Sequence, residues 1–151
     1  MSKTFTSIFH EAVIPLNEGL FSKKNIPDSF YKDGEKICKI VNPKISFEKE
    51  SRKKSTKLCA NELDTNLTFK QIENHMKSCG LTQVGRERVY MSTNFTVSKR
   101  EALYRKGDEY YVYIVSGSED KDTDKMEMII IAIYYVKGKK LNDEDFYKYF
   151  S

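Results

Sequence analysis

The sequence predicts a single α+β domain: a four-stranded, mainly antiparallel sheet with two helices packed on it, plus an irregular basic N-terminal arm. A chain of 151 residues is long enough for one hydrophobic core but not for two. Runs rich in Val, Ile, Tyr, Phe and Thr, typical of strands, follow residue 80. Helix-start signals lie on either side of those runs. We therefore divide one compact domain into an arm, residues 1–65, and an α-β-β-β-β-α core, residues 66–151.

The arm carries the basic surplus of the chain. Residues 1–60 hold 12 Lys and Arg against 7 Asp and Glu, whereas residues 61–151 hold 14 and 15. All three prolines lie in the arm and predict short, interrupted elements. A short amphipathic helix ending at Pro15 is predicted by apolar residues at helical spacing, namely Phe5, Ile8, Phe9, Ala12 and Val13.

The rest of the arm has weaker signals. Residues 37–41 and 45–47 are apolar runs on either side of Asn42 and Pro43, a pattern compatible with a hairpin. Residues 50–57 are polar, and we expect them to be exposed.

The first core element is predicted to be a helix over residues 68–79. Thr68 followed three residues later by Gln71 is a capping box, and Gly80 is a helix-stop signal. One buried stripe is indicated by Phe69, Ile72, Met76 and Cys79.

Four strands are predicted over residues 81–91, 93–104, 109–116 and 125–137. Residues 105–108 are a tight hairpin signal, and residues 117–124 have nothing to bury, which indicates a solvated loop. The last strand is apolar on both of its alternating faces, so we expect it to be central and covered on both sides.

A short C-terminal helix is predicted to begin at Asn142. Asn is a favourable N-cap, the acidic residues that follow suit the positive end of a helix, and Leu141 is spaced to pack on Phe146.

Composition excludes several classes of protein. The longest uncharged apolar run, residues 128–136, is under half of the ~20 residues that a membrane-spanning helix needs, so we expect no membrane association. Near the N-terminus, Thr6 and Ser7 separate the apolar positions, and His10 and Glu11 follow them, unlike a secretory signal. Three cysteines fit a reducing compartment better than a disulfide framework. A cytoplasmic location is expected, either in a host cell or inside a virion if the chain is phage-encoded.

Catalytic and metal-binding motifs are not found. A metal site would need converging ligands, and the chain offers only His10, His75, Cys38, Cys59 and Cys79. His75 and Cys79 are four apart on the predicted helix, but there is no Cys-x-x-Cys, and Cys79 belongs to the apolar stripe. We therefore predict no catalytic residue, metal or cofactor. A small enzyme with an unrecognised histidine site stays open as an alternative.

Nucleic-acid binding is a second alternative. Tyrosines on predicted strands lie near basic residues, and an aromatic sheet edged by cations can stack bases while a basic arm follows the phosphates. The candidate residues are Lys49, Arg52, Lys53, Lys54, Lys57, Arg86, Arg88, Arg100, Arg105, Lys106, Tyr111 and Tyr113.

The favoured interpretation is a non-enzymatic binding or structural protein that acts through its surface. A segmented polar arm with a few apolar anchors can lie on a protein partner, and the edge of a small sheet can accept another strand. A protein partner is therefore expected, nucleic acid remains the rival, and the pattern does not predict an oligomeric state.

The first residues resemble a known family. Lys3-Thr4-Phe5, Phe9, Glu11-Ala12 and the run from Leu16 to Gly19 are similar to the capsid-targeting propeptide of internal head proteins in large contractile-tailed phages. The resemblance implies that a prohead protease recognises Leu16, cleaves after Glu18 and leaves Gly19 as the new N-terminus. Such processing would raise the net charge from +4 to +5, which suits packaging beside DNA.

Overall fold

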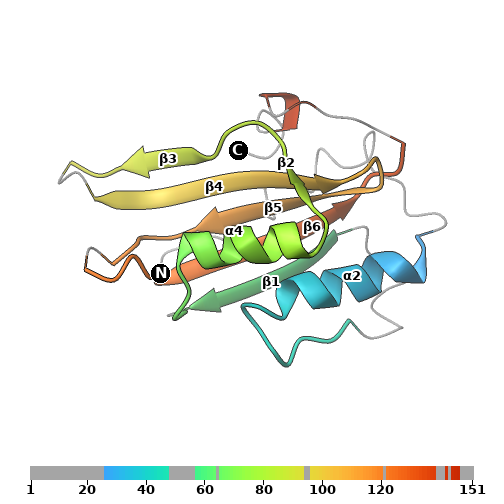
Figure 1. The fold of residues 1–151 in the computed structure, drawn as a ribbon, viewed down its shortest axis with the longest axis horizontal. Coiled ribbons are helices and arrows are strands. Elements are labelled where there is room, and N and C mark those ends of the chain that lie inside the picture. The colour runs from blue at the N-terminus through green and yellow to red at the C-terminus, as the bar shows by residue number, and fades with distance from the viewer. Residues whose placement is uncertain are drawn as a thin grey trace, which may run out of the picture.

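The protein is an α+β fold built on an open, antiparallel six-stranded sheet (Figure 1). The structure, a computed structural model, describes residues 26–47, 57–63, 65–93, 96–120, 122–138, 142 and 144–146. The strands are β1 (Lys57–Leu63), β2 (Thr82–Gln83), β3 (Arg88–Met91), β4 (Val97–Lys106), β5 (Tyr110–Ser116) and β6 (Met128–Tyr135). The sheet order is β1-β6-β5-β4-β2, and β3 also pairs with β4.

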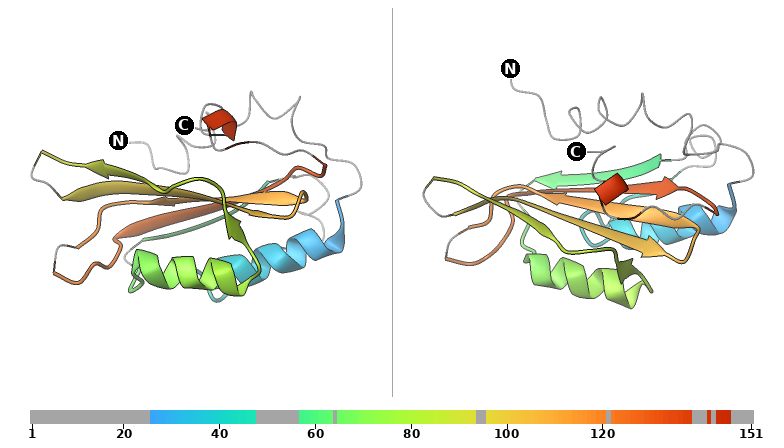
Figure 2. Two further views of the ribbon diagram at one scale, coloured as in Figure 1. Left: turned by 45° about the horizontal axis from the view of Figure 1, so that its top comes forward. Right: turned by 90° about the horizontal axis from the view of Figure 1, so that it is seen from above.

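Two helices cover one face of this sheet (Figure 2). They are α2 (Asp28–Cys38) and α4 (Phe69–Ser78), and their apolar stripes join the inward side chains of the strands in one core cluster. The opposite face carries a second cluster, into which Phe146 inserts from a helical turn at residues 144–146. Strands β5 and β6 are therefore buried on both faces.

Helix α4 confirms the predicted capping. The Gln71 N–H donates to Thr68 Oγ1 at 3.2 Å, and the Thr68 N–H donates to Gln71 Oε1 at 2.8 Å. At the other end Gly80 has φ +80°, which lets the Leu81 N–H reach the Met76 carbonyl at 3.1 Å and close a Schellman motif. Local signals were sufficient to predict this helix.

The predicted hairpin at residues 37–47 is wrong. Ile37 and Cys38 form the last turn of α2, because Phe30, Gly34, Ile37 and Val41 lie on one buried stripe with helical spacing. Gly34 lies within α2 and does not interrupt the helix. A Cβ at this position would lie 2.6 Å from Leu58 Cδ1, so glycine allows close approach of α2 to β1.

The predicted strand number is also wrong, for two reasons. Residues 81–91 form two short strands, β2 and β3, interrupted near Gly85, which has φ +69°. Strand β1 was not predicted, and it pairs with β6 along its whole length. Both β1 and α2 precede residue 66 and yet form part of the packed core.

The remaining strand predictions are confirmed. Strands β4 and β5 pair antiparallel around a turn containing Gly107, and β6 lies between β1 and β5. Its alternate side chains enter the two core clusters, as its two apolar faces predicted. Asn142 caps the C-terminal turn, since its Oδ1 accepts the Asp145 N–H at 2.7 Å. Leu141, its predicted partner for Phe146, lies outside the described residues.

Candidate binding surface

Exposed apolar side chains are concentrated on one edge strand. Of the described residues, four large hydrophobic side chains are exposed, and three of them are consecutive on β3: Val89 at 41%, Tyr90 at 39% and Met91 at 53%. The fourth, Leu63, ends β1 at the far edge of the sheet. Apolar side chains gathered on an edge strand are typical of a protein-binding surface.

The β3–β4 hairpin is held in shape by polar contacts at its tip. The Ser92 N–H donates to the Thr96 carbonyl at 2.8 Å, and the two hydroxyls of these residues are 2.6 Å apart. Ser98 Oγ donates to the Tyr90 carbonyl at 2.9 Å. The register shifts between Tyr90 and Met91, which increases the local twist of the strand. The exposed residues therefore lie on an ordered support.

Tyr90 lies beside a partly buried ion pair, Lys99 with Glu101, on the face of the sheet opposite the helices. Lys99 Nζ is 2.9 Å from Glu101 Oε1 and 4.4 Å from the centre of the Tyr90 ring, and the Tyr90 hydroxyl makes a long contact of 3.5 Å with Glu101 Oε2. Glu101 is 2% exposed, so its charge depends on Lys99 for compensation. These contacts fix the orientation of the ring.

Of the strands in the described part of the chain, only β4 pairs with β3. The other edge of β3 is therefore available for main-chain pairing. Alternate N–H and C=O groups of an edge strand point away from its neighbour and can pair with an added strand. Figure 1 shows β3 at the margin of the sheet. The same edge therefore offers both main-chain groups and apolar side chains.

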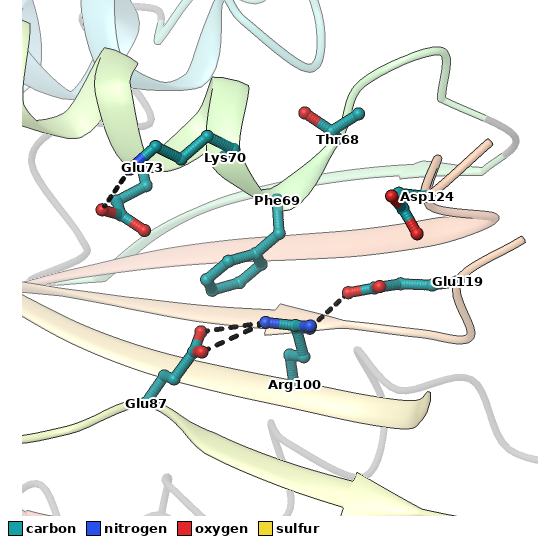
Figure 3. A pocket seen from close by; sticks show the side chains of 8 residues that line it. All are labelled: Thr68, Phe69, Lys70, Glu73, Glu87, Arg100, Glu119 and Asp124. Atoms are coloured by element: carbon teal, nitrogen blue, oxygen red, sulfur yellow. Dashed lines mark hydrogen bonds and ion pairs between the residues drawn. The ribbon is translucent and has the colours of Figure 1, made fainter. Parts of the chain in front are cut away.

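A cavity of about 460 Å³ adjoins this strand on the helix-covered face (Figure 3). Its centre is Arg100, which pairs across the strands with Val89. Arg100 Nη1 lies 3.1 Å from Glu87 Oε1, and its Nε forms an ion pair with Glu119. The guanidinium carbon is 5.2 Å from the centre of the Phe69 ring. Arg100 thus joins β4, the β2–β3 connection, the loop after β5 and the start of α4.

Carboxylates outnumber cations in this cavity, with Glu73, Glu87, Glu119 and Asp124 against Arg100 and Lys70. Besides Arg100, Glu87 and Glu119, it is lined by Lys70, Glu73, Asp124, Thr68 and Phe69. Glu73 contacts Lys70 at 3.4 Å and Lys77 at 3.0 Å, and its pKa is lowered chiefly by the hydrogen bond from Lys77. The ion pair with Arg100 holds Glu87, the residue directly before β3, against β4.

The described histidine contacts main-chain carbonyl groups, and two of the three cysteines are largely buried. His75 Nε2 lies 3.2 Å from the carbonyl oxygens of both Lys36 and Ile37, and 3.7 Å from Cys79 Sγ. Burial raises the pKa of the Cys38 and Cys59 thiols. Within the part of the chain that the structure describes, no group of three or more His, Cys, Asp or Glu side chains is arranged to hold a metal ion. His10 lies outside the described residues.

Within the described ranges, the predicted nucleic-acid residues do not form one surface. Tyr111 and Tyr113 are 2% and 1% exposed and pack on Phe146, so they offer no open ring face to a base. Arg100 is paired with two carboxylates, and Lys106 Nζ lies 2.7 Å from Asp33 Oδ2. The order of the sheet places Lys57 on β1, at the opposite edge from β3.

Three further candidates lie near the exposed strand or on β4: Arg86, Arg88 and Arg105. Arg88 is on β3, Arg86 is exposed two residues earlier, and Arg105 pairs with Thr82 of β2. The others, Lys49, Arg52, Lys53 and Lys54, lie outside the described residues, as do Glu18 and Gly19 of the predicted cleavage site. Those parts of the sequence analysis stay predictions.

The sequence analysis missed the residues that make this surface. Val89, Tyr90 and Met91 were assigned to a strand, but strand propensity does not distinguish an edge from a centre. The signal that was available is the Arg86-Glu87-Arg88 triplet directly before them, because charged residues are typical of sheet edges.

No family model, no curated protein and no solved structure matches this chain. Among the described residues, no helix combines the length and the apolar character needed to cross a membrane.

Proposed function

We propose that the chain is a binding protein whose β3 strand accepts an extended segment of a protein partner. The observation that carries this proposal is the exposure of Val89, Tyr90 and Met91 on an ordered edge strand. An added strand would pair with the main chain of β3, and its alternate side chains would contact these residues on the two faces.

The charge of the hairpin defines the partner further. Residues 86–101 carry four basic side chains, Arg86, Arg88, Lys99 and Arg100, against Glu87 and Glu101, and Glu119 also pairs with Arg100, so this group has a net charge of +1. A segment with alternating apolar side chains and a net negative charge complements this strand best, because its acidic residues would meet the basic surplus beside the apolar positions.

Selection from a displayed library of random ten-residue peptides against the full-length chain tests this proposal. We expect enriched peptides to alternate apolar residues and to carry Asp or Glu. Val89→Asp and Met91→Asp should each weaken a selected peptide about tenfold or more, as removal of a central contact does. Leu63→Asp is the matched control, because Leu63 is an exposed apolar residue at the opposite edge of the sheet.

Three results would contradict the proposal. The first is that no selected peptide loses affinity when Val89 or Met91 is replaced. The second is that Leu63→Asp weakens binding as much as these substitutions do. The third is tight binding of a mixed-sequence single-stranded oligonucleotide that weakens steeply with salt and is lost on Arg86→Glu and Arg88→Glu, because this would favour the nucleic-acid alternative.

The phage resemblance adds a proposal about maturation. If residues 1–18 are a capsid-targeting propeptide, cleavage between Glu18 and Gly19 would precede the binding function. Incubation of the full chain with a prohead protease, followed by intact-mass measurement, should give a product that begins at Gly19. Glu18→Gln should abolish that product, while Glu11→Gln should leave it unchanged.

A further inference from the structure

The sheet face opposite the helices is more deeply buried than its described neighbours explain. Nine side chains form its core, and each is at most 7% exposed: Leu103, Tyr111, Tyr113, Val115, Ile130, Ala132, Tyr134, Val136 and Phe146. We call this set the Tyr134 cluster. The other eight lie on the strands or, for Val136, directly after β6, whereas Phe146 comes from the C-terminal turn. Its ring centre lies 5.3 to 6.1 Å from the ring centres of Tyr111, Tyr113 and Tyr134.

One phenyl ring is too small to cover this face. The cluster extends over β4, β5 and β6, and the partly buried Cys59 extends it to β1. Four neighbouring strands at about 4.8 Å spacing span roughly 15 Å. Apolar sheet faces in globular domains are buried by a second layer of secondary structure. The rest of that layer has to come from residues outside the described ranges or from a second molecule.

The stretches outside the described ranges differ in the apolar side chains that could cover this face. Residues 48–56 contain no apolar side chain, and residues 139–141 contain one. Residues 147–151 contain aromatic side chains, but as a continuation of the helical turn at 144–146 they would add only about 7.5 Å, half the width of four strands. Residues 1–25 hold the only long apolar stripe at helical spacing among these stretches, formed by Phe5, Ile8, Phe9, Ala12 and Val13.

The point where the described chain begins is close enough to this face. Phe30, in the first turn of α2, contacts Tyr110 at the start of β5 and Tyr135 at the end of β6. Ile26 therefore begins near one end of the sheet. An extended chain from Val13 to Ile26 can reach up to about 40 Å, and the layers of a sheet and its helices are only about 10 Å apart.

We propose that residues 5–13 form a helix whose apolar stripe packs on the Tyr134 cluster, as an intramolecular third layer. The fold would then be helices, sheet and helix. This inference is independent of the β3 edge: it concerns a face of the sheet, with the chain's own N-terminal segment as occupant. The proposed cleavage after Glu18 would release that segment and expose a broad aromatic surface.

The three native cysteines make a direct test feasible. Cys59 packs against the Tyr134 cluster, whereas Cys38 and Cys79 belong to the helix-covered face. The full-length Ala12→Cys variant is treated at low protein concentration with a short bifunctional maleimide, and the linked peptides are mapped by mass spectrometry. We expect the introduced thiol to link to Cys59 within one molecule. Ser7→Cys, on the polar side of the predicted helix, should give much less of this product.

Other products would overturn the proposal. Linkage to Cys38 or Cys79 would place the segment on the helix-covered face, and linkage between two molecules would make a second copy the occupant. Absence of any linkage would also count against it, provided that a monofunctional maleimide modifies both thiols.

A second measurement does not depend on cross-linking. Phe5→Asp with Phe9→Asp should increase binding of a hydrophobic dye severalfold while the far-ultraviolet circular dichroism of the sheet is retained. Ser7→Asp with His10→Asp introduces the same two carboxylates on the polar side and should leave dye binding unchanged. Equal dye binding in the two variants would overturn the proposal. So would an increase confined to Phe150→Asp, because residues 147–151 would then be the cover.

Discussion

His75 of α4 contacts the main-chain oxygen of Lys36 at the end of α2, with 3.2 Å between this oxygen and the imidazole Nε2. The neighbouring Ile37 oxygen lies at the same distance. The last carbonyl groups of a helix have no partner within it, so the imidazole N–H satisfies groups that α2 leaves unpaired. One side chain therefore joins the two helices of the covered face.

His75→Ala should lower the free energy of unfolding by about 1 kcal/mol, since a partly buried hydrogen bond is lost and a carbonyl group is left without it. Urea denaturation followed by circular dichroism measures this change. Asn74→Ala, at an exposed position of the same helical turn, is the control and should change stability by much less. Equal effects of the two substitutions would mean that the contact to α2 contributes nothing.

Gly34→Ala should destabilise the protein by about 1 to 2 kcal/mol, although alanine is the better helix former. The added methyl group would lie 2.6 Å from Leu58 Cδ1 and 3.3 Å from Phe47 Cε2, so α2 or these side chains have to move. Ser29→Ala, on the exposed side of the same helix, is the control.

A double-mutant cycle with Leu58→Ala gives the sharper test of this contact. In the Leu58→Ala background the methyl group at position 34 has space, so the penalty of Gly34→Ala should disappear or change sign. Additive effects on the free energy of unfolding would contradict the close approach of α2 and β1.

Arg100→Met should lower the free energy of unfolding by about 2 kcal/mol, because it leaves Glu119 without its cation while most of that side chain is buried. The Arg100 side chain is 23% exposed, and solvent therefore reduces the effect below that of a fully buried pair. Lys70→Met removes a cation from the same cavity at a side chain that is 71% exposed, and should change stability little. Glu119→Gln should recover part of the stability lost by Arg100→Met.

Buried tyrosines predict loss of stability at alkaline pH. Burial, with smaller contributions from Glu73 and Glu87, raises the pKa of Tyr104 from 10.0 to about 12. Between these two values the unfolded chain releases a proton that the folded chain keeps, so stability present below pH 10 is lost as the pH rises. Each such group contributes a slope of about 1.4 kcal/mol per pH unit.

Tyr104→Phe should therefore make the decline in the free energy of unfolding less steep between pH 10 and 11.5. Urea midpoints at half-unit intervals measure the slope. Leu103→Met is the control, because it perturbs the neighbouring buried position without changing an ionisable group and should shift stability equally at every pH. An unchanged slope in Tyr104→Phe would contradict burial of the phenol group.

Local signals in the sequence predicted the elements that depend on local interactions. Thr68, Gln71 and Gly80 mark the start and the end of α4, and runs of β-branched and aromatic residues identify β5 and β6. Strand β1 lacks such a signal, because Asn61 and Glu62 favour strands poorly. It is a strand because it pairs with β6, about seventy residues away.

The candidate surface could not be predicted from local sequence, because its contacts join residues that are far apart in the chain. Arg100 meets Glu87 and Glu119, which are 13 and 19 residues away and lie on two different connections. The stacking interpretation of Tyr111 and Tyr113 failed for a related reason. Their rings pack on Phe146, more than thirty residues further on, and no local pattern connects these positions.

The pairing of β1 with β6 has a consequence for synthesis of the protein. The first described strand has its partner in the last, so its main-chain groups cannot be satisfied until residue 135 has left the ribosome. A chain that stops before residue 128 would lack β6, leaving β1 and β5 without the strand that joins them. Nascent fragments of that length should therefore bind chaperones, whereas the completed chain should not.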